Sequence, residues 1–284
     1  WYINYHTQGG KYIKDVDFDV ITPGELEPVT SESDRTGGTS VFPDWYLNQQ
    51  RFVRECGKIA DLMLAWSPHE QKPLFLFDGS FVISFAGQML PDRAQPYITA
   101  VTDLLEISKT TRIPVVAFVD SSYSRDLAAL IDWMNNDEPR RGLTDARLLG
   151  EQLPHWGDRS PLFWCDRDDT LSREGRGSFY RNVAFCYMRL TADGDPVRVE
   201  MPRWMVEEGT AEDALCLVRA EAVVGNGYPW ALETADALAV LRMEDRERFH
   251  QLFEQFARQY DIAMQRTSKT QSKLMRRPAQ RANA

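Results

Sequence analysis

Two aspartates lie in the most apolar segments of this sequence, and carboxylates in such positions can bind a divalent cation. Asp78 interrupts the apolar run of residues 73–85, and Asp120 ends the apolar run of residues 113–120. A charge within a buried strand costs free energy unless it is paired or binds a cation. The sequence therefore predicts that Asp78 and Asp120 have a functional role.

A third acid can join these two from the segment between them. The periodicity of residues 96–109 predicts a helix that carries Asp103 and Glu106. A strand, a helix and a second strand with this spacing form a crossover unit, and sites are usually built at the carboxyl ends of its parallel strands. Mg²⁺ and Mn²⁺ sites typically use one or two protein carboxylates together with phosphate and water, and two such ions can promote phosphodiester hydrolysis.

The spacing alone leaves other interpretations open. Each aspartate could instead cap a turn or pair with a nearby cation such as Arg125. Several metal-dependent and phosphoryl-transfer enzymes share two acids at strand ends, so the pattern does not select one reaction.

The order of four sequence blocks is more specific, and it resembles the motifs of the NurA nuclease family over residues 73–245. The blocks are Phe77-Asp78-Gly79-Ser80, Val119-Asp120-Ser121-Ser122 with Ser124-Arg125, the paired segments 185–190 and 198–204, and Gly227-Tyr228-Pro229-Trp230 continuing to Asp236. The resemblance implies a ribonuclease H-like core and Mn²⁺-dependent cleavage of DNA, with Mg²⁺ as the alternative metal and one or two ions bound. It also implies 5′-to-3′ exonuclease and single-strand endonuclease activity in DNA end processing, a HerA-type hexameric translocase as partner, and a homodimer.

The resemblance assigns roles to individual residues. Asp78 matches the first metal ligand, Asp120 matches the carboxylate of the second strand, and Tyr228 matches the active-site tyrosine. Glu106, on the preceding helix, is the choice for the remaining acid. Asp236 stands eight residues after the tyrosine, where many members have histidine, and it could bind metal but could not act as a neutral nitrogen ligand.

Tyr228 also has a physical interpretation of its own. Gly225 and Gly227 allow a tight turn before Pro229, at the start of a helix whose amino terminus favours anions. The phenol could bond a phosphate oxygen or stack on a base, although a buried core tyrosine fits the local pattern equally well.

Other segments predict the elements that position these residues in an α/β fold with a mixed sheet flanked by helices. We expect an amino-terminal hairpin over residues 1–20, a loop over 21–43, and helices over 43–66, 126–153 with an interruption at Pro139–Gly142, 210–223 and 230–260. We also expect a short strand over 160–165 and a hairpin of residues 182–190 with 196–202. The domain prediction is a single domain over residues 1–265, with a core at about 73–245, and a basic tail over 266–284.

The charge balance argues against binding nucleic acid by bulk charge alone. The chain of 284 residues has 42 acidic and 33 basic side chains and a net charge of −9. Six basic and no acidic residues lie in the tail, so the remainder is strongly acidic. The four cysteines lack zinc-site spacing, and the absence of an apolar run of 18 residues predicts a cytoplasmic protein without a membrane partner.

Two rival functions stay open. A catalytically degenerate nuclease fold could serve as an interaction module that docks on a translocase, and a metal-dependent phosphoesterase could use the same core. Both would keep the fold and change the chemistry.

Overall fold

The computed structural model describes residues 2–5, 11–14, 16, 35–36, 39–40, 44–138, 140, 142–240 and 242–259. The predicted basic tail and most of the predicted loop over 21–43 lie outside these ranges. The chain divides into two compact units, residues 1–238 and residues 239–284.

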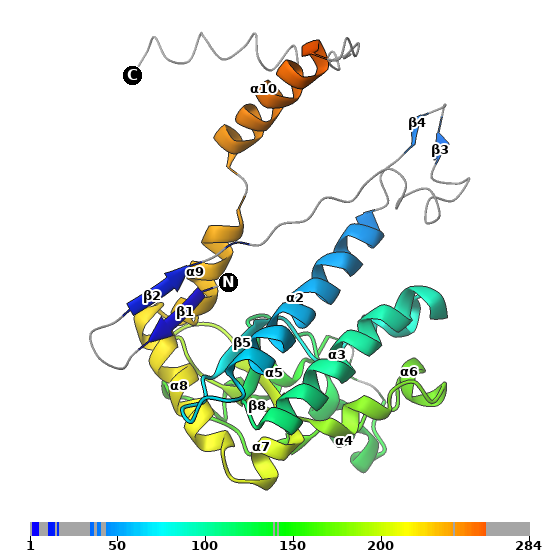
Figure 1. Cartoon of the computed structure of the whole chain (residues 1–284). Coiled ribbons are helices and arrows are strands. Elements are labelled where there is room, and N and C mark those ends of the chain that lie inside the picture. Colours follow the sequence, from blue (N-terminus) through cyan, green and yellow to red (C-terminus); the bar gives the residue numbers. More distant parts are fainter. Residues whose placement is uncertain are drawn as a thin grey trace, which may run out of the picture. The chain divides into compact units, whose positions relative to one another are not determined.

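A mixed sheet of five strands forms the centre of the first unit (Figure 1). Its strands, in spatial order, are β5 (Phe75–Asp78), β6 (Val115–Val119), β9 (Val197–Pro202), β8 (Val183–Met188) and β7 (Phe163–Trp164). The first two strands are parallel and the other neighbours are antiparallel. This arrangement confirms the predicted α/β class with a mixed sheet.

Helices cover both faces of the sheet. Side chains alternate between the two faces along each strand, so each strand contributes to a core on either side. Phe77 and Ala117 belong to the core on one face, whereas Leu76 and Phe118 pack on the other. Helices α2 (Asp44–Trp66) and α3 (Pro91–Thr111) lie side by side on the first face, and α7 (Arg203–Glu207) and α8 (Ala211–Val224) lie on the second (Figure 1).

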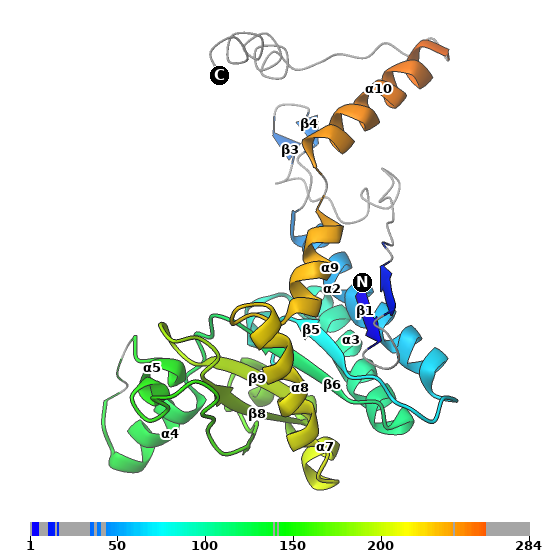
Figure 2. The same cartoon turned by 90° about the vertical axis from the view of Figure 1, so that its left-hand side faces the viewer.

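The remaining elements complete the molecule. Figure 2 shows α4 (Asp126–Asn135) and α5 (Asp145–Gly150) beside the β8 end of the sheet, away from α3. Among the described residues, four further strands form two hairpins, β1 (Tyr2–Tyr5) with β2 (Lys11–Lys14) and β3 (Arg35–Thr36) with β4 (Thr39–Ser40). The connections also contain the 3₁₀ helices η3 (Ser84–Gln88) and η4 (Ser178–Asn182) and the α-helices α6 (Thr170–Arg173) and α9 (Trp230–Ala239). The second unit contains α10 (Met243–Gln259). No helix among the described residues is both long and apolar enough to cross a membrane.

Most predicted elements are present, and the differences have local causes. The strand predicted over residues 73–85 ends at Asp78. The Gly79 N–H still bonds the Phe118 carbonyl of β6, but the N–H groups of Phe81 and Val82 bond the Glu200 side chain and not a neighbouring strand. The helix predicted from residue 96 begins at Pro91, whose ring suits a first helical position.

The helix predicted over 230–260 is two helices. α9 ends at Ala239 and α10 begins at Met243. The backbone N–H of Arg242 bonds the Asp245 carboxylate at 3.1 Å, a contact typical of a helix start.

Candidate functional site

Asp78 and Asp120 lie at the same edge of the sheet. Asp78 is the last residue of β5 and pairs with Phe118 of the parallel strand β6, and Asp120 directly follows that strand. Because Asp120 is two residues beyond Phe118, both carboxylates project from the same face of the sheet. Both aspartates are exposed, so a ligand in solvent can reach them.

Tyr228 joins this edge from the connection between α8 and α9. Its hydroxyl donates a hydrogen bond to Asp78 Oδ1 over 2.8 Å. Its ring meets Phe118 edge to face, with ring centroids 5.2 Å apart. Partial burial raises the pKa of Tyr228 well above its usual range, and the hydrogen bond to Asp78 and the nearby charges of Asp78, Asp120 and Asp236 raise it further. The phenol therefore stays protonated and donates to the carboxylate.

Two glycines allow the tight turn that places Tyr228 next to Asp78. A Cβ at Gly225 would lie 1.9 Å from the Tyr228 carbonyl oxygen, a distance that no side chain can occupy. Gly227 has a φ of +106°, and a Cβ there would meet the Thr191 methyl at 2.5 Å. The predicted tight turn before Pro229 is present and requires glycine at both positions.

Asp236 contributes charge to the same region from α9. Its side chain is exposed and its negative charge reaches the Tyr228 hydroxyl. The amino terminus of α9 is bonded by an anion of the chain itself, because the Glu221 carboxylate accepts a hydrogen bond from the Ala231 N–H at 2.9 Å. Thus the acid groups, and not a free helix terminus, dominate the electrostatics around Tyr228.

Glu106 lies apart from these residues. It is exposed on α3, which covers the opposite face of the sheet from Asp78 and Asp120. Ser108, half a turn further along, accepts a hydrogen bond from the Trp204 indole at 3.2 Å, and Trp204 follows the end of β9 at the far edge. The structure thus places this part of α3 near the edge of the sheet opposite the two aspartates, and none of the described contacts joins Glu106 to them.

Glu55 is an acid near Asp78 that the sequence analysis missed. It lies on α2, one turn from Phe52, whose ring contacts Phe77 with centroids 5.7 Å apart. Its pKa is raised by desolvation and by the charge of Asp78, while Arg51 lowers it. The only local signal is an Arg51–Glu55 pair at helical spacing, 3.7 Å apart, which is typical of any solvated helix face.

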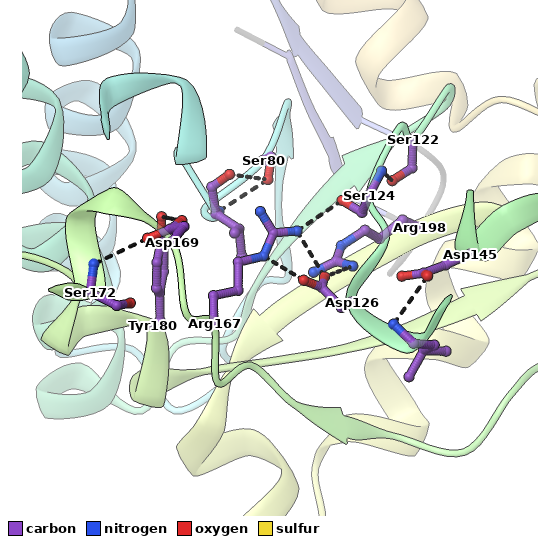
Figure 3. Close-up of polar contacts among 12 residues, drawn as sticks. Ser80, Ser122, Ser124, Asp126, Asp145, Arg167, Asp169, Ser172, Tyr180 and Arg198 are labelled. Atoms are coloured by element: carbon purple, nitrogen blue, oxygen red, sulfur yellow. Dashed lines mark hydrogen bonds and ion pairs between the residues drawn. The ribbon is translucent and has the colours of Figure 1, made fainter. Parts of the chain in front are cut away.

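The segment after Asp120 is held by charged side chains (Figure 3). Arg167 donates to the Ser124 hydroxyl at 3.0 Å and to the Asp126 carboxylate at 2.8 Å. Burial raises the pKa of Asp126, but the charge of Arg198 and the hydrogen bond and charge of Arg167 outweigh it and hold this pKa below its usual range. Asp126 therefore stays ionised, and the alternative partner considered for this region, Arg125, pairs with Asp132 instead.

The side-chain oxygens at this edge supply some of the ligands that a hard cation needs. Asp78 and Asp120 offer carboxylate oxygens, which Mg²⁺ and Mn²⁺ prefer. In the described part of the chain, however, no three His, Cys, Asp or Glu side chains are grouped so as to hold a metal. The edge thus offers two carboxylates, which is the number that such ions take from proteins when phosphate and water complete the shell.

Comparisons with known proteins agree with the motif order. Residues 4–241 match the NurA domain family. The fold is similar to the crystal structure of the NurA nuclease from Sulfolobus solfataricus, with a TM-score of 0.53 and 15% sequence identity over 91% of this chain and 76% of that chain. A search of curated protein sequences found no match.

Proposed function

Because the chain belongs to the NurA family of nucleases, we propose that it is a metal-dependent deoxyribonuclease that hydrolyses phosphodiester bonds. The observation that carries the proposal is the meeting of Asp78, Asp120 and Tyr228 at one edge of the sheet. These residues are separated by up to 150 positions in sequence, yet the Tyr228 hydroxyl bonds Asp78 directly. The same three residues match the family motifs.

Asp78 and Asp120 would hold the metal, one or two Mn²⁺ ions with Mg²⁺ as the alternative. Their carboxylates share one face and one edge, and the negative charge of Asp236 lies close by. Like charges this close repel one another, so a bound cation relieves the repulsion. When bound, such an ion supplies a water of lowered pKa and offsets the charge of the phosphate.

Tyr228 would orient Asp78 and contact the DNA strand. Its hydroxyl fixes one oxygen of Asp78, which leaves the other oxygen free for a cation. The ring is held against Phe118, and the residue remains partly open to solvent. A phenol so placed can meet a phosphate oxygen or a base at the site of cleavage.

The remaining features are proposed on family membership. They are a ribonuclease H-like core, 5′-to-3′ exonuclease and single-strand endonuclease activity, assembly as a homodimer, and action with a HerA-type translocase in DNA end processing. The net charge of −9 supports a partner that grips the duplex, because this chain's overall charge repels DNA.

The test is a cleavage assay with single-stranded DNA and end-labelled duplex DNA in Mn²⁺, Mg²⁺ and EDTA. Asp78→Asn and Asp120→Asn should each abolish cutting while retaining the wild-type unfolding temperature. Asp213→Asn, an exposed acid in the first turn of α8, is the matched control and should cut at the wild-type rate.

Each outcome separates this proposal from its rivals. Full activity of Asp78→Asn would overturn the site assignment. DNA binding without cutting in any divalent metal would favour a non-catalytic interaction module. Hydrolysis of small phosphate esters with no action on DNA would favour a phosphoesterase.

A further inference from the structure

Two charged side chains are buried in the middle of the sheet on β9. Arg198 is 1% exposed and Glu200 is fully buried. A buried ion pair is costly to desolvate, and well-packed apolar residues in its place are often at least as stable. Their neighbours on this face, Phe185 and Ala117, are apolar. Stability alone therefore does not explain why an ion pair occupies these positions.

Glu200 holds the segment that directly follows Asp78. Its Oε2 accepts hydrogen bonds from the backbone N–H of Phe81 at 2.7 Å and of Val82 at 3.2 Å, and from the Ser80 hydroxyl at 2.9 Å. One carboxylate oxygen thus accepts the hydrogen bonds that these N–H groups would otherwise donate to a neighbouring strand. It fixes where the chain goes immediately after Asp78.

Arg198 holds the segment that follows Asp120. Its Nη1 donates to Asp126 Oδ2 at 2.7 Å, and Figure 3 shows Arg167 reaching the same carboxylate. The guanidinium lies over the Phe185 ring, 3.8 Å from its centroid, so its plane is fixed as well. Asp126 begins α4, six residues after Asp120, and anchors the connection between them.

A single hydrogen bond joins the two halves. Arg198 Nε donates to Glu200 Oε1 at 2.7 Å. The bonds therefore run without a gap from the segment after Asp78, through Glu200 and Arg198, to the segment after Asp120. This continuous path crosses from β5 to β9 beneath the edge where the two aspartates lie.

We propose that Arg198 and Glu200 are positioning residues that set the spacing between Asp78 and Asp120, and so set how the pair binds its divalent cation. The inference rests on the proposed nuclease function. It also explains why the pair is ionic: the planar guanidinium can bond Glu200 and Asp126 at once from a fixed geometry. A lysine cannot reproduce this bridge.

The experiment compares Glu200→Gln and Arg198→Lys with Arg189→Lys. Arg189 is the matched control, because it is another largely buried arginine, 8% exposed, whose bonds go to the carbonyls of Leu153, Gly150 and Gly194. All three variants keep side-chain size close to the original, so each should fold. Thermal unfolding is recorded first, and cleavage is measured below the lowest unfolding temperature.

We expect Glu200→Gln and Arg198→Lys to lower kcat by about 10- to 100-fold, the loss typical of a catalytic group displaced by about 1 Å. The Mn²⁺ concentration for half-maximal activity should rise, and KM for DNA should stay unchanged. Arg189→Lys should lower the unfolding temperature without changing kcat or the Mn²⁺ requirement. The inference is overturned if the first two variants lose no more activity than Arg189→Lys.

Hydrogen exchange separates this inference from the proposed function. Peptides covering residues 79–83 and 121–128 should exchange faster in both Glu200→Gln and Arg198→Lys, and at the wild-type rate in Arg189→Lys. If wild-type protein cuts no DNA, the nuclease proposal fails, and exchange alone decides whether the two segments are coupled. Unchanged exchange in both segments would refute the coupling.

Discussion

Removing one oxygen atom from Tyr228 tests the geometry of the candidate site most directly. Tyr228→Phe deletes the hydroxyl that donates to Asp78 at 2.8 Å, and it keeps the ring that packs against Phe118. The change leaves both aspartates in place. Any loss of activity therefore reports the orientation of Asp78 or the missing contact to DNA, and not a loss of packing.

The expected loss follows from the type of bond. A hydrogen bond to a charged group contributes about 1.5–3 kcal/mol, and the lower value applies here because Asp78 is exposed and Tyr228 is only half buried. Since 1.36 kcal/mol corresponds to a factor of ten in rate, kcat should fall by roughly tenfold. The free energy of unfolding should fall by no more than the same amount, about 1.5 kcal/mol, because the bond is open to water.

The assay measures kcat, KM for DNA and thermal unfolding for Tyr228→Phe and for Tyr123→Phe. Tyr123 lies in the segment after Asp120 and is 86% exposed, so its variant controls for the loss of a nearby phenol. Tyr228→Ala should lose more activity than Tyr228→Phe, since it also removes the contact with Phe118. Wild-type kcat in Tyr228→Phe would refute the role given to the hydroxyl.

Three further predictions follow from the structure. Glu106→Gln should cut DNA at the wild-type rate, whereas Glu55→Gln, next to Asp78, should shift the Mn²⁺ requirement; the reverse result in a metal titration would restore Glu106 to the site. Gly225→Ala should lower kcat and the unfolding temperature together, because its methyl group meets the Tyr228 carbonyl; an unchanged melting curve would contradict the contact. Asp126 has a lowered pKa in the folded state, so its stabilisation is complete above the unfolded value of about 3.9 and is lost as the pH falls through the lower folded value. Asp126→Asn should therefore weaken the dependence of stability on pH below about 4, and an acid titration as steep as that of wild type would refute it.

The sequence was sufficient to predict the two strands that carry the aspartates. The apolar runs of residues 73–85 and 113–120 are typical of central strands, and the intervening helix favours their pairing as parallel neighbours. Once the strands are parallel, their last residues must lie at one edge. This local pattern is why Asp78 and Asp120 could be found without a structure.

A third acid could not be selected in the same way. Glu106 and Glu55 both lie on exposed helix faces, and neither spacing nor residue type distinguishes them. Both helices lie over the same face of the sheet, and which glutamate comes near Asp78 depends on how α2 and α3 pack against each other and the sheet, which joins residues far apart in sequence. The ends of helices were misjudged for a simpler reason, since prolines such as Pro96 occur inside a helix as well as at its start.

The buried charges of β9 show a second limit of sequence patterns. Alternation in residues 197–202 predicts a strand with one polar face, and Arg198 and Glu200 would then be expected in solvent. In the structure both faces of β9 are buried, because α3 and its neighbours cover one side and α8 covers the other. Polar side chains on a face that is covered in this way must form hydrogen bonds or ion pairs with other parts of the chain.

The two faces of the sheet therefore have different roles at the candidate site. The face that carries Leu76 and Phe118 presents Asp78, Asp120 and Tyr228 at its edge, where solvent can reach them. The opposite face holds the ion pair that bonds the segments after both aspartates. A change on the hidden face can thus alter chemistry on the open one only by moving the backbone between them, which is why hydrogen exchange of residues 79–83 and 121–128 is the decisive measurement.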